Sequence, residues 1–283
     1  MVLKMKTFTN PDNNATKAKK EFNITDQVTK PLIPADISEF WTGIIEPILF
    51  NMIEKNFYAV RIKNRNNYYS GNQNYAKLLY GVHTCYYDGQ AAYYFCKKAF
   101  NSRFHLMIEQ LYRFPLLSKL GAFSIEKDTP YDALKSLNYA AHLLRNKNNT
   151  VWIFPQGRVM PCDHKPIKFE KGIAYISNKA KKVNIIPVAV KYTFVRNEKP
   201  EIFVEFGTPV VLDNGTKNKK ELTEHLEIAL SELMENQAND ISNGIYDGYE
   251  YIYMSRETMF RKLEHLFKNL IYDKRYLAKK CPQ

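Results

Sequence analysis

The chain alternates between short apolar runs and longer segments in which apolar residues recur at helical spacing. Seven apolar runs bounded by polar or turn residues predict strands, at 58–63, 78–82, 104–108, 122–126, 150–154, 184–191 and 201–206. Helical spacing between them predicts helices over 90–100, 129–144 and 172–180. This alternation predicts an α/β fold, with a mixed, largely parallel sheet layered with helices and completed by the strand at 201–206. Pro187 predicts an edge, a strand start or a bulge in its own strand.

Two amphipathic segments flank the alternating region. Apolar residues recur at helical spacing over 36–57, where Pro47 predicts a kink or break, and over 259–271, where cationic residues surround the stripe. Each stripe could pack on the domain or lie in a membrane interface. Neither is long and apolar enough to span a bilayer, and residues 1–35 lack the apolar core of a signal peptide. We therefore expect a flexible polar tail (1–35), an amphipathic membrane-associating segment (36–57), an α/β domain (58–212) and a C-terminal helical extension (213–283).

Charge narrows the classes of partner. The 283 residues carry a formal net charge of +12, which favours a polyanionic partner such as nucleic acid, a phospholipid surface or an acidic carrier protein. Zinc-finger spacing and RNA-binding aromatic motifs are missing from the sequence, so we expect no nucleic acid. The four cysteines show neither metal-ligand nor disulfide spacing, and we expect reduced thiols and no metal.

The most informative chemistry lies in the run from Gly81 to Gly89, which contains His83 and Asp88 after a predicted strand and before a predicted helix. An imidazole can take the proton of an attacking alcohol, and a nearby carboxylate can orient the ring and stabilise its charged form. The alternative interpretation is a solvated loop histidine followed by an aspartate that caps a helix. Cys85 lies between the two residues, but adjacency in sequence does not bring a thiol to a base, so a thiol nucleophile is disfavoured.

Four blocks in order over residues 58–210 resemble those of the glycerolipid acyltransferase family, which includes bacterial 1-acylglycerol-3-phosphate acyltransferases. The blocks are His83-x4-Asp88, Gly121–Lys127, Phe154-Pro-Gln-Gly157 and Ile185–Val190, and Phe169–Gly172 matches a further turn. Residues 58–212 would thus be the catalytic domain. The resemblance implies transfer of a fatty acyl group from acyl-CoA or acyl carrier protein to a lipid hydroxyl, with a lysophospholipid such as 1-acylglycerol-3-phosphate as acceptor. It implies no cofactor beyond the acyl donor.

The resemblance also assigns roles to residues. His83 and Asp88 would be catalytic, and Lys127, which ends the second block, would bind the acceptor. From the residues themselves, we expect the backbone around Gln156 and Gly157 to hold the oxyanion, and Arg158 and Lys168 to add positive charge that binds the acceptor. The enzyme would work at the cytoplasmic face of a membrane as a peripheral protein.

The third block departs from the family pattern. Gln156 stands where glutamate is usual, and Arg158 and Val159 stand where threonine and arginine are usual. Three alternatives therefore stay open. The acceptor could lack phosphate, as a glycolipid or pigment hydroxyl does; the acyl group could pass directly between lipids; or the protein could be a non-catalytic lipid-surface protein with the same fold.

Overall fold

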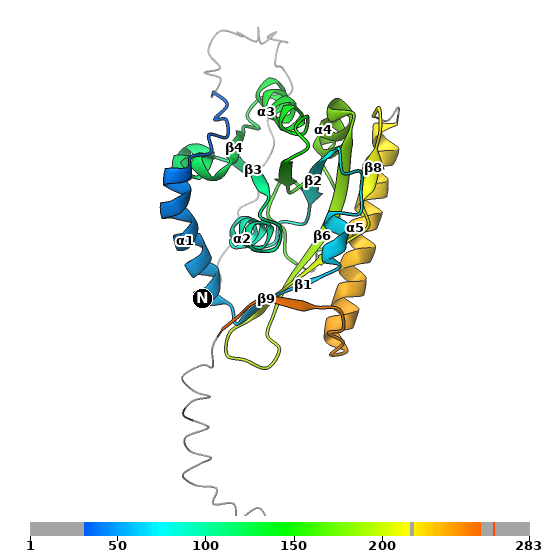
Figure 1. Ribbon diagram of the computed structural model, residues 1–283. Helices are drawn as coiled ribbons and strands as arrows, with labels where there is room; N and C mark the ends of the chain where they lie inside the picture. The colour runs from blue at the N-terminus through cyan, green and yellow to red at the C-terminus, as the bar shows by residue number, and fades with distance from the viewer. Residues whose placement is uncertain (1–30, 163, 216–217, 256–262, 264–283) are drawn as a thin grey trace, which may run out of the picture. The chain divides into compact units, whose positions relative to one another are not determined.

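The computed structural model describes residues 31–162, 164–215, 218–255 and 263. Within them, helices alternate with the strands of one sheet (Figure 1). The strands are β1 (Ala59–Lys63), β2 (Ala76–Tyr80), β3 (Arg103–Glu109), β4 (Ala122–Ile125), β5 (Asn149–Ile153), β6 (Val183–Thr193), β7 (Glu201–Phe206), β8 (Val210–Leu212) and β9 (Glu250–Met254). The helices are α1 (Glu39–Asn56), α2 (Asp88–Phe100), α3 (Pro130–Leu143), α4 (Gly172–Ala180) and α5 (Lys219–Ser242), with 3-10 turns η2 (Arg65–Tyr68), η3 (Leu111–Arg113) and η4 (Pro115–Leu120).

The sheet has the order β4-β3-β5-β2-β6-β7-β1-β9, and β8 pairs with β6 beside this path. The neighbours from β4 to β6 are all parallel, as are β7 and β1, whereas β6 pairs antiparallel with β7 and β8, and β1 with β9. The predicted mixed, largely parallel sheet of an α/β fold is therefore confirmed.

Helices cover both faces of the sheet because its central strands are apolar on both sides. In β2, Leu79 belongs to the core that packs against α1 and α2, while Leu78 and Tyr80 belong to the core beneath α3, α4 and α5. Strands buried on both faces read as continuous apolar runs, which is why the sequence predicted them well.

The structure corrects the expected place of Pro187. This residue lies in the middle of β6, a central strand, so the predictions that it lies at a sheet edge or at a strand start are both wrong. On one side Pro187 pairs with Tyr80 of β2; on the other, pairing is interrupted between Ile185–Val210 and Val188–Phe206. The proline thus occupies a place where its missing N–H removes no ladder hydrogen bond.

Three other expectations change. The chain does not break at Pro47, since α1 runs without interruption from Glu39 to Asn56. The sheet does not end with β7, because β8 and β9 follow it. Ile33 and Ala35, which we expected in the flexible tail, form hydrogen bonds with Ser124 and Tyr139.

The predicted amphipathic stripe at 259–271 lies outside the described residues except for Leu263. None of the described helices is long and apolar enough to cross a membrane.

Candidate active site

The candidate residues gather where four parallel strands end. His83 follows β2, the turn of Phe154 to Gly157 follows β5, Glu109 ends β3, and Lys127 follows β4. Because these strands are parallel neighbours, their carboxyl ends meet at one edge of the sheet, where α/β proteins commonly bind ligands.

The structure brings His83 and Asp88 together. His83 Nδ1 lies 2.8 Å from Asp88 Oδ2, and Asp88 is the first residue of α2. The carboxylate points back toward His83 rather than capping the helix, whose N-cap is Tyr87. The interpretation of Asp88 as a helix cap is therefore wrong, and the imidazole has its Nε2 left for a ligand.

Asp88 is buried, with only 5% of its surface exposed, yet it is well supplied with donors. Its Oδ2 also accepts hydrogen bonds from the backbone N–H groups of Thr84 (2.6 Å) and Cys85 (2.8 Å), and its Oδ1 accepts one from the Tyr192 hydroxyl (2.8 Å). Burial alone would raise the pKa of Asp88, but the hydrogen bonds from His83, Cys85, Tyr192 and Thr84 outweigh it and hold the pKa below its usual value. Asp88 is therefore a carboxylate at neutral pH.

His83 is fixed from two further sides. Its ring stacks on Phe154, with the centroids 4.5 Å apart, and its backbone N–H donates to Gln156 Oε1 at 2.9 Å. A glutamate would accept the same hydrogen bond. Gln156 therefore replaces the usual family residue without losing this contact.

The turn after β5 requires its glycine. Gly157 has φ +68°, a left-handed conformation that costs side-chain-bearing residues free energy, and an added Cβ would lie 3.2 Å from Glu170 Cγ. The Gly157 N–H donates to Phe154 O at 3.1 Å, and its carbonyl accepts from Lys127 Nζ. The N–H that we expected to hold an oxyanion is thus committed to the turn.

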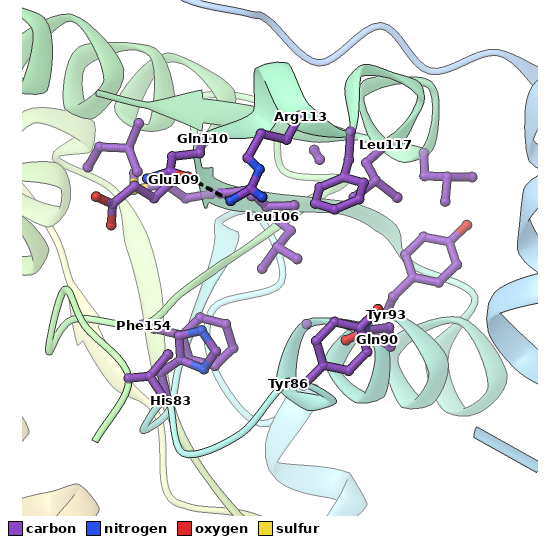
Figure 2. A pocket seen from close by; sticks show the side chains of 18 of the residues that line it. His83, Tyr86, Gln90, Tyr93, Leu106, Glu109, Gln110, Arg113, Leu117 and Phe154 are labelled. Atoms are coloured by element: carbon purple, nitrogen blue, oxygen red, sulfur yellow. Dashed lines mark hydrogen bonds between the residues drawn. The ribbon is translucent and has the colours of Figure 1, made fainter. Parts of the chain in front are cut away.

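A large apolar cavity, of about 1120 Å³, opens beside the histidine (Figure 2). It lies between β3, α1, α2 and the η3–η4 segment, and most of its lining is apolar, including Leu49, Met52, Leu106, Ile108, Leu117 and Leu120. His83, stacked on Phe154, lies at one end (Figure 2). The volume of the cavity exceeds the range of about 300–1,000 Å³ that is typical of small-molecule sites, so the cavity has room for a long apolar chain.

Some of the cationic side chains expected to bind the acceptor line the cavity, and one does not. Lys127 and Arg158, two of the residues expected to bind the acceptor, both line it, but Lys127 Nζ is paired with Glu109 Oε2 at 2.7 Å. Lys168 does not line it: it pairs with Glu227 of α5 at 3.2 Å, so the structure separates it from the other candidates. Arg113, from η3, extends into the cavity and donates to Gln110 Oε1 at 3.3 Å (Figure 2).

The sequence did not single out Arg113, Glu109 or Tyr192. Glu109 and Arg113 follow the predicted strand at 104–108, and Tyr192 lies 104 residues from its partner Asp88. Only Glu109 had a signal in the sequence, its position at the end of a strand, whereas Arg113 and Tyr192 had none. Cys85 Sγ lies 3.5 Å from Asp88 Oδ1, and burial together with the Asp88 charge raises the pKa of its thiol, which argues against a reactive thiolate.

The part of the chain that carries the candidate site resembles a known family. A family model described as Acyltransferase matches residues 60–191. This stretch of the chain is similar to acyltransferases. The match spans the strands β1 to β6 and both catalytic candidates, so the family resemblance inferred from the sequence is confirmed.

Among solved structures, the chain is similar to the 1-acyl-sn-glycerophosphate (LPA) acyltransferase PlsC from Thermotoga maritima. The two are 17% identical over 70% of this chain and 89% of that one, with a TM-score of 0.48. No curated protein sequence matches this chain significantly.

Proposed function

We propose that this acyltransferase moves a fatty acyl group from acyl-CoA or acyl carrier protein to the hydroxyl of a lipid. The observation that carries the proposal is the His83–Asp88 pair at one end of a large apolar cavity. A general base at one end of an apolar cavity suits a substrate with a reactive polar end and a long hydrocarbon chain.

The chain's own residues support a direct transfer. His83 Nε2 takes the proton of the acceptor hydroxyl while that oxygen attacks the thioester carbonyl carbon, and Asp88 stabilises the imidazolium that forms. The tetrahedral intermediate collapses, the C–S bond breaks, and the leaving thiolate takes the proton back from His83. The products are an ester and a free thiol, with no acyl-enzyme and no cofactor.

Stabilisation of the oxyanion needs a donor near the turn after β5. Because the Gly157 N–H donates to Phe154 O, it is not free to act unless the turn changes. The Gln156 backbone stays a candidate, and the Arg158 guanidinium lines the same cavity as a charged donor.

The acceptor we propose is a lysophospholipid, such as 1-acylglycerol-3-phosphate. Three cationic side chains (Arg113, Lys127 and Arg158) and one carboxylate (Glu109) line the cavity, so the lining favours an anionic headgroup. Lys168 leaves the set because Glu227 holds it elsewhere.

An acceptor without phosphate is the second candidate, and one contact favours it. Glu109 neutralises Lys127, the side chain in the family's cation position, and a carboxylate at that place opposes a phosphate dianion. A glycolipid hydroxyl would meet no such penalty.

A peripheral position at the cytoplasmic face of a membrane completes the proposal. The outer face of α1 exposes apolar side chains (Phe40, Ile44 and Ile48), and the η3–η4 segment beside it exposes Tyr112, Phe114 and Leu116. Apolar residues exposed next to the cavity suit insertion into a lipid interface, through which a lipid acceptor would enter. The net charge of +12 suits both anionic lipids and an acidic carrier protein.

Thiol release from a long-chain acyl-CoA and from acyl carrier protein tests the proposal and separates its acceptors. Lysophosphatidic acid, zwitterionic lysolipids, a lysoglycolipid and a total lipid extract would be compared as acceptors. Fastest release with lysophosphatidic acid supports the phosphate acceptor; equal or faster release with lysoglycolipid supports the second candidate. Acyl exchange between lipids without a thioester would indicate transacylation, and vesicle binding without any turnover would indicate a non-catalytic lipid-surface protein.

A further inference from the structure

The two oxygens of the Asp88 carboxylate are held by different parts of the chain. Oδ2 receives its donors locally, from His83 Nδ1 and from the N–H groups of Thr84 and Cys85. Oδ1 receives the Tyr192 hydroxyl at 2.8 Å and the Cys85 thiol at 3.5 Å. A thiol is a weak donor, so the strong hydrogen bond to Oδ1 is the one from Tyr192.

The surroundings of Tyr192 keep its hydroxyl protonated, so that it can donate a hydrogen bond. It lies near the end of β6, and its ring packs 5.6 Å from that of Phe57, the residue that follows α1. Burial, with the Asp88 charge, raises the pKa of Tyr192 well above its usual value, so the hydroxyl keeps its proton. Because Asp88 is buried, water cannot easily replace this hydrogen bond if it is removed.

The orientation of the carboxylate matters for a base that works by proton transfer. A carboxylate can rotate about its bond to Cβ, and a small rotation moves the oxygen that meets the imidazole. The amides of Thr84 and Cys85 hold Oδ2, and a second point is needed on Oδ1 to fix the plane of the group. Tyr192 supplies that second point from a strand far away in the sequence.

We propose that Tyr192 is a positioning residue of the His83–Asp88 pair: its hydroxyl holds Asp88 Oδ1 so that Oδ2 faces His83 Nδ1. Tyr192 touches neither substrate nor the reacting atoms and acts through Asp88. The catalytic part of this inference rests on the proposed function. The structural part, that Tyr192 orients Asp88 and thereby His83, does not depend on it.

The kinetic test compares Tyr192→Phe with Tyr87→Phe. Tyr87 is a matched control, because its ring also packs on Phe57, with the ring centroids 5.1 Å apart. Tyr87→Phe removes a phenolic hydroxyl, as Tyr192→Phe does, but not one that donates to the Asp88 carboxylate. We expect Tyr192→Phe to lower kcat about 10-fold and to leave KM for the thioester and the acceptor within about two-fold. Tyr87→Phe should keep the wild-type kcat. Thermal unfolding of each variant sets an assay temperature at which it is folded.

A double-mutant cycle separates positioning from general packing. If Tyr192 acts through the carboxylate, Tyr192→Phe should cause no further loss of rate in an Asp88→Ala background. An equal loss in both backgrounds, or a kcat for Tyr192→Phe equal to that of the control, would overturn the proposal.

A measurement without turnover keeps the inference separate from the proposed function. The ¹⁵N shifts of His83, assigned by their absence from His83→Ala, report which ring nitrogen carries the proton in neutral imidazole. We expect Nδ1 to carry it in the wild type and in Tyr87→Phe, and the Nδ1–H share to fall in Tyr192→Phe. Unchanged shifts in Tyr192→Phe overturn the positioning role even if the protein proves inactive. A wild type that holds the Nδ1–H form but transfers no acyl group contradicts only the proposed function.

Discussion

At the scale of single residues, the site divides into contacts close in sequence and contacts made by the fold. His83 and Asp88 are five residues apart, and the loop between them supplies two further N–H donors to the carboxylate. Gln156, by contrast, reaches His83 from another strand end, 73 residues away. The chemistry of the base is thus local, whereas its fixed orientation depends on the sheet.

The contact between Gln156 and the His83 backbone predicts different results for two substitutions. Gln156→Ala leaves the His83 N–H without its acceptor, which should lower the free energy of unfolding by about 1–3 kcal/mol and reduce kcat. Gln156→Glu keeps an acceptor in the same place and should stay within a few-fold of wild-type activity. Denaturant unfolding and steady-state kinetics check both, and equal losses in the two variants would contradict the role of this hydrogen bond.

The sequence identified the site residues whose signal is local. His83, Asp88, Gln156 and Gly157 lie in short motifs after apolar strands, and the structure places them together. Lys168 was misassigned because charge alone does not say which carboxylate a lysine will meet, and here it meets Glu227. Tyr192 and Arg113 have no local signature, since their relation to the site exists only after the sheet has formed.

At the scale of elements, prediction worked best where strands and helices are buried. The helix at 172–180 and the strand at 201–206 have the bounds that the apolar pattern gave them. Strand β9 was missed because it lies at the sheet edge and three of its five residues are exposed. Tyr251–Met254 is a run of only four apolar residues, and what fixes this strand at the sheet edge is contact with other elements.

One such contact joins β9 to the sheet. The Arg61 guanidinium of β1 pairs with Glu201 of β7, with Nη2 and Oε2 2.7 Å apart, and lies 4.4 Å from the centroid of the Tyr251 ring of β9. Glu201 is 1% exposed, so the loss of its partner would leave a buried charge.

We predict that Arg61→Leu lowers the free energy of unfolding by about 3–5 kcal/mol and speeds amide hydrogen exchange over 250–254. The double variant Arg61→Leu/Glu201→Leu removes both charges and should recover much of the loss in stability. Denaturant unfolding measures the first effect and exchange mass spectrometry the second. If the double variant is as unstable as the single one, the loss does not come from an unpaired Glu201.

Helix α1 carries a second prediction at this scale. Phe40, Ile44 and Ile48 are 70%, 45% and 55% exposed on its outer face. Replacing all three with glutamate should weaken binding to anionic phospholipid vesicles more than 10-fold, because each loses apolar area that a lipid interface would bury. Ile228→Glu on α5, which is 57% exposed, is the control and should bind as the wild type does. Equal binding by the wild type and the triple variant in vesicle co-sedimentation would show that this face of α1 does not dock on lipid.

At the scale of the whole molecule, two large apolar cores on opposite faces of one sheet, with a smaller cluster of Phe203, Ile241 and Tyr249, hold the described residues together. The sheet also buries polar groups, among them His105 of β3, which is 2% exposed and whose Nδ1 lies 3.2 Å from Gly121 O. Burial lowers the pKa of His105, and nearby Arg103 lowers it further, while hydrogen bonds with Asn149 and Gly121 act in the opposite direction.

This lowered pKa predicts how stability depends on pH. The unfolded chain binds a proton at this histidine below about pH 6.5, whereas the native protein resists it. The stability is therefore complete above about pH 6.5 and is lost as the pH falls toward the native pKa of His105, by at most about 1.4 kcal/mol per pH unit. His105→Gln should flatten the dependence of unfolding free energy on pH between 7.5 and 5.5. Parallel curves for wild type and variant would contradict the assignment.

The central claim is that His83 is the base of an acyl transfer to a lipid hydroxyl, and one measurement tests it most directly. Ester formation would be followed by mass spectrometry with a long-chain acyl-CoA and the best acceptor, comparing wild type, His83→Ala and His142→Ala. His142 is exposed on α3 and serves as the matched control. We predict that His83→Ala slows ester formation by about 10²–10⁴-fold while His142→Ala keeps the wild-type rate. Equal rates in the wild type and His83→Ala would contradict the account.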